Sequence, residues 1–387
     1  MGLNRNLVPH CVGFFYGNKT EGKGKMRKII TSESVNCGHP DKTCDIIADS
    51  FLSEALRQDE NAQMAVECAI KNDKLFIYGE ATTTANLDYE AIAKDVLKEI
   101  GYENEFQITK EISCQSPDIA QAVKKQELMA NDQGMVYGYA TNETKEFMPL
   151  PIVIAHKLMR QYDEYRRTTD CYFADAKSQV SVEYEDDKPV VIKTVVVSVS
   201  HSEKLEWQTI YNDIKTNVVD VVLEEYNNFV ADDIEYIINP SGKFTIWGSF
   251  GDSGCVGRKI VVDTYGGVGR VGGGCFSSKN ATKVDRSGAY YARFVAKNIV
   301  AKGLADRCEL QAGFAIGLAE PISLTIDTFG TNKVEEREIY DFVKKNFSFR
   351  LQNIIDELGL LNVNYKKTAC FGHFGNDEFP WEQIKNI

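Results

Sequence analysis

The sequence lacks the long apolar runs that a membrane-spanning helix requires. Its apolar stretches, such as residues 195–199, are only as long as a strand, whereas a transmembrane helix needs about 18 consecutive apolar residues. Long runs of lysine and arginine are also missing, and 44 basic residues stand against 56 acidic ones, for a net charge of −12. Nucleic-acid phosphates are bound by basic surfaces. We therefore expect neither a membrane protein nor a nucleic-acid-binding protein.

Histidine and paired cysteines are also scarce. Five histidines in 387 residues argue against a multi-histidine metal site, and ten cysteines are scattered with no CxxC pair. Zinc-ligand spacing, HExxH, a nucleophile elbow and a P-loop are all absent. Cysteines spread through a chain of this size favour a reducing compartment, so we expect a cytoplasmic protein. Residues 1–25 resemble no signal peptide, and we expect them to be a flexible N-terminal extension.

What is present is a globular composition, 43% hydrophobic, with a recurring order of elements. A helix is expected over residues 40–57, two strands over 63–71 and 75–80, and a second helix over 88–100 that Gly101 ends. The same order returns twice. The second copy has a helix over 150–166, strands over 178–184 and 190–201, and a helix over 207–225; the third has a helix over 287–302, strands over 309–316 and 322–327, and a helix over 335–346. Paired strands between helices indicate an α+β fold in which antiparallel hairpins form the sheets.

Residues 31–42 carry the first chemical signal. His39, Asp41 and Lys42 stand where a strand gives way to a helix. Free backbone N–H groups at a helix start favour anions, and Asp41 could hold a metal ion. The alternative is that Asp41 only caps the helix and that His39 is a turn residue.

A glycine-rich stretch, residues 263–274, carries the second chemical signal. It contains Gly267-x-Gly269-x-x-Gly272 after an apolar run at 260–262 that we interpret as a strand. A dinucleotide-binding fingerprint must open directly into a helix, and more glycines and serines follow instead. A turn that brings backbone close to a phosphate is the better interpretation, with simple loop flexibility as the alternative.

Charged residues flank that stretch on both sides. They are Asp252, Arg258 and Lys259 before it and Lys279, Lys283, Asp285 and Arg286 after it. A polyphosphate held by lysine and arginine, with Mg²⁺ on aspartates, needs this mixture. A solvated charged surface is the alternative. The segment around Asp175 and Lys177, which we place just before a strand, is by itself an ordinary polar strand entry.

Together these segments resemble the S-adenosylmethionine synthetase (methionine adenosyltransferase) family, in its bacterial form, from about residue 27 to 381. The matching segments, in order, are TSESVNCGHPDK, CQSPDIAQ, NDQGMVYGYATNET, DAKSQVSVEY, NPSGKF, FGDSGCVGRKIVVDTYGG, GGGCFSSKNATKVDRSGAY, FAIGLAEP and FGHFGNDEFPWE. The resemblance implies transfer of the adenosyl group of ATP to the sulfur of L-methionine, followed by hydrolysis of the triphosphate to phosphate and pyrophosphate. Such chemistry depends on alignment and on stabilising charge at the triphosphate.

The resemblance also implies roles for individual residues. Catalysis would rest on His39, Lys177, Arg258, Lys259 and Lys279. ATP would also contact Asp175, Lys243, Phe244, Asp252 and Cys275, with Phe244 stacked on adenine. Methionine would be held by Glu80, Gln115, Asp132, Asp252 and Lys283. The expected metals are Mg²⁺, two per site, at Asp41 and Asp285, and K⁺ beside Glu67.

The same resemblance implies three interleaved, pseudo-symmetric subdomains, each a mixed sheet with helices on one face. The expected boundaries are 26–37 plus 143–243, 38–114 plus 244–285, and 115–142 plus 286–387. Residues 115–129 would close over the active site. Two chains would share two sites in a homodimer that could pair into a tetramer.

Departures from the family pattern leave alternatives open. Met129-Ala-Asn131 stands before Asp132 where glycines are usual, the segment from 115 to 132 is slightly short, and Trp247 replaces a small residue. The second hypothesis is therefore a paralogue with altered substrate scope, or one that binds a ligand or partner without turnover. A dinucleotide-dependent oxidoreductase, resting only on the glycine pattern, ranks far behind.

Overall fold

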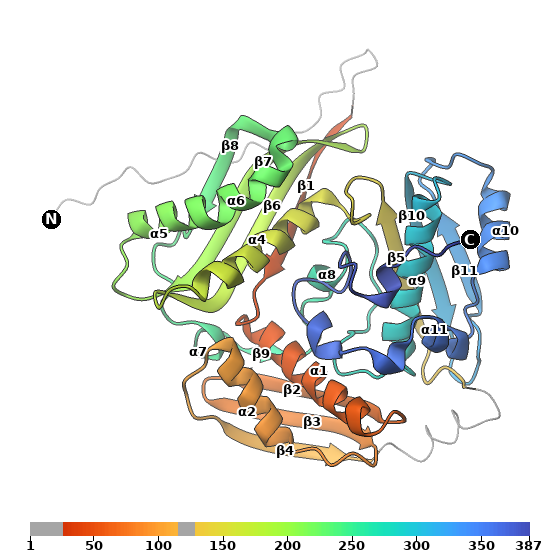
Figure 1. Cartoon of the computed structure of the whole chain (residues 1–387), viewed down its shortest axis with the longest axis horizontal. Coiled ribbons are helices and arrows are strands. Elements are labelled where there is room, and N and C mark those ends of the chain that lie inside the picture. The colour runs from red at the N-terminus through yellow and green to blue at the C-terminus, as the bar shows by residue number, and fades with distance from the viewer. Residues whose placement is uncertain (1–25, 115–127) are drawn as a thin grey trace.

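The computed structural model describes residues 26–114 and 128–387 (Figure 1). Residues 1–25 and 115–127 lie outside the described residues. The expected extension, Gln115 and most of the expected closing segment therefore receive no structural account.

Strands far apart in the sequence form the first sheet, which we call the β1 sheet. Its order is β1 (Arg27–Val35), β6 (Tyr172–Glu185), β7 (Lys188–His201) and β8 (Val230–Ile238). β7 and β8 are parallel, and the other pairs are antiparallel. Three helical elements cover one face: α4 (Leu150–Arg166), α5 (Trp207–Ile214) and α6 (Asp220–Leu223) (Figure 1). A separate apolar core fills the space between this sheet and its helices.

The second sheet, the β2 sheet, has the order β4 (Gln107–Ser113), β3 (Lys74–Thr82), β2 (Gln63–Lys71) and β9 (Gly254–Cys255). β3 and β4 are parallel, whereas β2 is antiparallel to both its neighbours. Two helices pack on it, α1 (Pro40–Gln58) and α2 (Tyr89–Ile100), and the short α7 (Gly248–Gly251) lies near its edge. Asp88 caps the start of α2, and Gly101 ends it at φ 118°, where glycine avoids the strain that other residues would meet.

The third sheet, the β5 sheet, is antiparallel throughout, in the order β11 (Ser323–Asp327), β10 (Arg307–Phe314) and β5 (Gly134–Thr141). The long helix α9 (Val284–Ala301) packs on it, so closely that a Cβ on Gly138 would lie 2.0 Å from the backbone of Ala292. The remaining elements are α8 (Ile260–Asp263), α10 (Glu336–Asn346), α11 (Leu351–Glu357), η3 (Leu360–Asn362), η4 (Tyr365–Thr368) and η5 (Pro380–Glu382).

The α+β expectation is confirmed, with three sheets and helices packed on one face of each. The sheets draw strands from separated segments in the way that interleaved subdomains require, and the exact boundaries stay a prediction. None of the described helices is long and apolar enough to cross a lipid bilayer.

Three local expectations were wrong. Residues 260–262 form the helical turn α8 rather than a strand. The segment around Asp175 and Lys177 lies inside β6 rather than before it. The single helix expected over 207–225 is interrupted by the π-helical turn η1 (Lys215–Val219) and ends in the 3₁₀ turn η2 (Glu224–Phe229).

Helix α1 is unusual because its first three turns are buried although they are rich in polar residues. Asp41 is 1% exposed, and Asp45 and Asp49 are fully buried. Pro40 at the first helical position and His39 at the N-cap begin the helix. The fold thus places a polar helix start in the interior, where the site begins.

Candidate active site

The start of α1 gathers one group of charged residues, which we call the Asp41 cluster. Lys259 Nζ donates a 2.7 Å hydrogen bond to Asp41 Oδ2, and Arg258 lies 3.5 Å from Oδ1. The N–H of Cys255 donates to the same Oδ1 at 3.0 Å. Burial alone raises the pKa of Asp41, but the Lys259 and Cys255 hydrogen bonds and nearby positive charge outweigh it and lower that pKa overall. Asp41 is therefore a carboxylate at neutral pH.

His39 lies beside Asp41 in a neutral form. Burial, followed by the charges of Lys259 and Lys177, lowers the pKa of His39 to about 3. Its Nδ1 accepts the backbone N–H of Asp41 at 3.2 Å. A neutral imidazole has one N–H, so the proton stands on Nε2. His39 can therefore donate a hydrogen bond from Nε2 but carries no charge.

Three further expected residues belong to the Asp41 cluster. Lys177 and Asp252 are both exposed and lie within electrostatic range of His39. Asp175 Oδ2 accepts the N–H of Gly248 at 2.9 Å, and burial raises the pKa of Asp175 to about 6.

Lys243 and Phe244 lie beside the end of β7. Phe244 is half-buried, and its backbone pairs with that of His201. Among the described residues, no hydrogen bond, ion pair or ring interaction joins either side chain to the Asp41 cluster, so their place near adenine stays a prediction.

A second group, the Asp285 cluster, lies where α9 begins. Lys279 Nζ donates a 2.7 Å hydrogen bond to Asp285 Oδ2. Burial lowers the pKa of Lys279, but Cys275 and Asp285 outweigh it, so the pKa rises and the ammonium is kept. Burial lowers the pKa of Lys283, against the opposing charges of Glu80 and Asp132.

Glu67 and Glu80 belong to the same cluster and come from the β2 sheet. Glu67 pairs in register with Tyr78, and Glu80 with Ala65, on the face that points away from the helices. The Tyr78 hydroxyl donates to Glu67 at 3.4 Å. The Asp285 cluster is therefore open toward the helix-free face of this sheet.

The two clusters are attached to the same strand at separate points. The backbone of Cys255, three residues before Arg258, pairs with Ala69, and that of Lys279 pairs with Ala65. Four residues of β2 separate these points, about 13 Å at 3.3 Å per residue. Across residues 26–114 and 128–387, no hydrogen bond or ion pair joins one cluster directly to the other.

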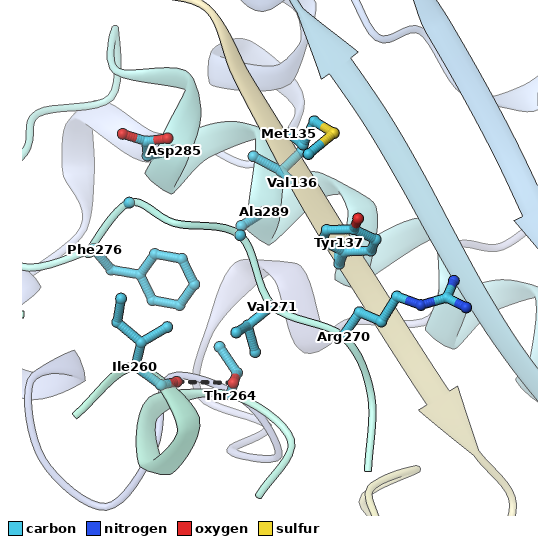
Figure 2. A pocket seen from close by; sticks show the side chains of 12 residues that line it. Met135, Val136, Tyr137, Ile260, Thr264, Arg270, Val271, Phe276, Asp285 and Ala289 are labelled. Carbon is cyan, nitrogen blue, oxygen red and sulfur yellow. Dashed lines mark hydrogen bonds between the residues drawn. The ribbon is translucent and has the colours of Figure 1, made fainter. Parts of the chain in front are cut away.

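A small pocket borders Asp285, between β5 and the glycine-rich stretch (Figure 2). Its walls include Met135, Val136, Ile260 and Phe276, so they are largely apolar. At two positions of the stretch, neighbouring atoms lie too close to the backbone for any residue other than glycine. A Cβ on Gly274 would lie 2.2 Å from the Asp285 carboxyl group, and one on Gly272 would lie 2.4 Å from the Met135 carbonyl. No helix begins in the described chain between Gly272 and Val284, and a helical turn rather than a strand precedes the stretch. Both features disagree with a dinucleotide-binding fingerprint.

The buried ion pairs that support the site from the protein interior were not predicted from the sequence. Lys42, which the motif suggested for chemistry, is fully buried and pairs with Asp45 and Asp263. Asp49 pairs with Arg286, which is also buried. The signal that could have found them is the spacing of Asp41, Asp45 and Asp49, which places all three on one helix face.

Comparison with sequence families shows similarity along nearly the whole described chain. Models described as the N-terminal, central and C-terminal domains of S-adenosylmethionine synthetase match residues 27–127, 127–244 and 246–383. These segments are consecutive, whereas the β1 sheet pairs β1 of the first segment with β6 of the second.

Individual proteins similar to this chain are named S-adenosylmethionine synthase. The S-adenosylmethionine synthase of Mesoplasma florum is 46% identical over 374 residues, 94% of this chain and 99% of the relative. The S-adenosylmethionine synthase of Clostridium tetani is 44% identical over 386 residues, 94% and 98% of the two chains. That of Akkermansia muciniphila is 46% identical over 377 residues, 92% and 95%.

Proposed function

This chain belongs to the S-adenosylmethionine synthetase family, and from that premise we propose that the Asp41 and Asp285 clusters together form its active site. The activity is S-adenosylmethionine synthesis, in which the adenosyl group of ATP is transferred to the sulfur of L-methionine. The observation that carries the proposed site is the pairing of Lys259 with Asp41 and of Lys279 with Asp285, at 2.7 Å each.

The cations of the Asp41 cluster fit the leaving triphosphate. A thioether is a neutral nucleophile, so the barrier falls mainly through alignment and through stabilising charge that grows on the leaving oxygens. Lys177, Arg258 and Lys259 supply fixed positive charge around the start of α1. Hydrolysis of the triphosphate would use the same cations.

His39 fits the role of a neutral donor to the leaving oxygen. Its Nδ1 is occupied by the N–H of Asp41, so Nε2–H is the group available to substrate. A neutral donor stabilises developing negative charge without transferring its proton. The low pKa of about 3 keeps the imidazole neutral across the physiological range, while the Asp41 N–H on Nδ1 selects the tautomer.

The family uses divalent and monovalent metal ions, and we assign Mg²⁺ to Asp41 and Asp285. The described residues contain no group of three or more His, Cys, Asp or Glu side chains that could hold a metal ion by themselves. One carboxylate per cluster nevertheless fits Mg²⁺, which keeps several waters and is bound through one or two carboxylates plus substrate phosphates. When bound, Mg²⁺ would neutralise phosphate charge. K⁺ beside Glu67 remains part of the proposal.

Methionine would bind at the Asp285 cluster. Lys283 can pair with the methionine carboxylate, while Glu80 and Asp132 can pair with its ammonium group. Glu80 and Asp132 both lie within electrostatic range of Lys283. Gln115, expected to contact methionine, lies outside the described residues.

We also propose that two chains share each site, with the Asp285 cluster of one facing the Asp41 cluster of the other. The clusters of one chain are anchored about 13 Å apart along β2. Glu67 and Glu80 lie on the helix-free face of the β2 sheet, which also exposes Phe76 by 43%. The β5 sheet exposes Met135 by 60%. Apolar side chains on such faces are typical of surfaces that another copy covers.

The direct test is an assay of the full chain with ATP, L-methionine, Mg²⁺ and K⁺, with the sulfonium product and the released phosphates measured by mass spectrometry and phosphate detection. Product formation that stops when Lys279 or Lys259 is neutralised supports the site. Turnover that survives both changes would contradict it. A panel of methionine analogues in the same assay tests the altered substrate scope suggested by residues 115–132.

A further inference from the structure

Helix α1 carries three aspartates, Asp41, Asp45 and Asp49, spaced by four residues, so all three lie on one face of the helix. We call them the α1 aspartate row. Their exposed fractions are 1%, 0% and 0%. Buried carboxylates are costly unless they are paired, and each of these has its own cation: Lys259, Lys42 and Arg286.

Each aspartate of the row also accepts a backbone N–H from a segment of the proposed site. Asp41 accepts that of Cys255 at 3.0 Å, and Asp45 accepts that of Gly257 at 2.9 Å. Asp49 accepts that of Ser278 at 3.0 Å. The row therefore connects two backbone segments to a single helix: residues 255–257, which lead to Arg258 and Lys259, and Ser278, which precedes Lys279.

Asp45, like Asp49, has no proposed contact with substrate or metal, and it supports the segment that carries Arg258 and Lys259. Its Oδ1 holds Gly257, and its Oδ2 accepts from Lys42 Nζ at 2.8 Å. Gly257 immediately precedes Arg258 and Lys259, and its φ of +78° marks a turn that depends on glycine. A Cβ there would also lie 2.4 Å from that of Cys275, so this turn touches the segment that leads to Lys279.

The spacing of the row matches the spacing of the clusters. Asp41 and Asp49 are eight residues apart, about 12 Å at 1.5 Å per helical residue. The strand β2 anchors the same two segments about 13 Å apart. Helix α1 and strand β2 pack side by side, and both thus hold the two segments at about the same distance from one another.

We propose that Asp45 is a positioning residue: by holding the Gly257 N–H it orients the Gly257–Lys259 turn so that Arg258 and Lys259 meet the triphosphate. The inference rests on the proposed function of those two cations. Asp49 shows the same arrangement at the other segment, where it holds Ser278, next to Lys279, and pairs with Arg286, next to Asp285. The row is accordingly a part of the site rather than a general core feature.

Asp45 can be tested without leaving a buried cation unpaired, because Lys42 also pairs with Asp263. Asp45→Asn keeps an oxygen that can accept from Gly257, whereas Asp45→Val removes it. Asp45→Val should lower kcat about 10- to 100-fold and raise the KM for ATP, as a misplaced binding group does. The KM for methionine should stay within about twofold, since methionine binds at the other cluster. Asp45→Asn should recover most of kcat.

The matched control is Leu52→Ala, a fully buried position on the same helix with an apolar side chain. It should lower the unfolding temperature while kcat at 25 °C remains near wild type. Lys259→Met, measured in parallel, separates the two proposals. If Lys259→Met retains turnover, the proposed site itself is wrong. If Lys259→Met loses turnover while Asp45→Val keeps it, or if Asp45→Asn and Asp45→Val are equally impaired at equal unfolding temperatures, Asp45 does not position the turn.

Discussion

Lys259 Nζ and Asp41 Oδ2 are joined by a 2.7 Å hydrogen bond in which the lysine is 15% and the aspartate 2% exposed at the side chain. A proposed phosphate-binding cation and a proposed metal-binding carboxylate are therefore partners of one another. Asp41 would hold Mg²⁺ through the carboxylate that Lys259 contacts here, and Lys259 would then be available to a phosphate oxygen. Lys279 and Asp285 repeat the relationship at the second cluster.

Loss of the cation at the second cluster should reduce turnover strongly. Lys279→Ala removes a proposed donor to the leaving group, and loss of such a donor typically costs about 2–4 kcal/mol in the barrier, roughly 30- to 1,000-fold in kcat. Steady-state kinetics of product formation measure it. Lys333→Ala is the control, because Lys333 forms an exposed ion pair with Asp306 away from both clusters. Turnover of Lys279→Ala within a few-fold of wild type would show that Lys279 is misplaced.

Removal of the carboxylate charge at Asp41 should weaken the response to Mg²⁺. Asp41→Asn keeps an oxygen that can accept the Cys255 N–H but replaces the proposed anionic metal ligand with a neutral amide. Metal stabilisation of the transition state is worth several kcal/mol, so we expect kcat to fall on the order of 100-fold and the half-saturating Mg²⁺ concentration to rise. A Mg²⁺ titration of activity measures both. Asp233→Asn, at an exposed ion pair with Lys193, should leave the titration unchanged. An unchanged Mg²⁺ midpoint in Asp41→Asn would contradict the metal assignment.

Acid should destabilise the fold partly through a buried histidine outside the two clusters. Burial, then the charges of Arg160 and Lys42, lowers the pKa of His156 to about 3, below its ordinary value of 6.5. Between pH 6.5 and 3 the unfolded chain binds a proton at this residue that the folded chain does not. Its contribution to stability is therefore complete above pH 6.5 and is lost as pH falls toward 3.

The magnitude of that loss follows from one proton. The slope is about 1.4 kcal/mol per pH unit once the unfolded histidine is protonated. Urea unfolding at several pH values would measure it in wild type and in His156→Gln. The difference in unfolding free energy between the two proteins should change by that slope below pH 6. A pH-independent difference would mean that His156 is protonated in the folded state.

Much of the fold could be predicted from sequence because local signals agreed with tertiary packing. The strand at Gln63–Lys71 and the helix at Leu150–Arg166 lie where periodicity placed them. The short run at 260–262 was misassigned because a few apolar residues do not distinguish a buried strand from a helical turn. β8 was not predicted because its sequence does not alternate regularly between apolar and polar residues. Charged residues occupy three of its nine positions.

The candidate site was predictable in its residue types but not in its grouping. Charge and motif order identified Lys259 and Lys279, but nothing local in the sequence indicates that they lie in different clusters. That separation comes from β2, which pairs with one segment at Ala69 and with the other at Ala65. Asp45 and Asp49 escaped notice because aspartates within a helix are usually solvated, and only tertiary burial gives them partners.

If two chains share each site, two inactive variants should restore activity when mixed. In a heterodimer of Asp41→Asn and Lys279→Ala chains, one site receives both substitutions and the other receives neither, because each site takes Asp41 from one chain and Lys279 from its partner. Random exchange of subunits at equal amounts makes half of the dimers mixed, so activity should recover to roughly a quarter of wild type. The mixture is refolded together or coexpressed, and the separately prepared variants define the baseline. A chain with both substitutions, mixed with wild type in the same way, should give dimers with two defective sites and lower the activity instead. Recovery that never exceeds the sum of the two variants, while mass spectrometry of the intact complex shows mixed dimers, would place both clusters in a site built by one chain.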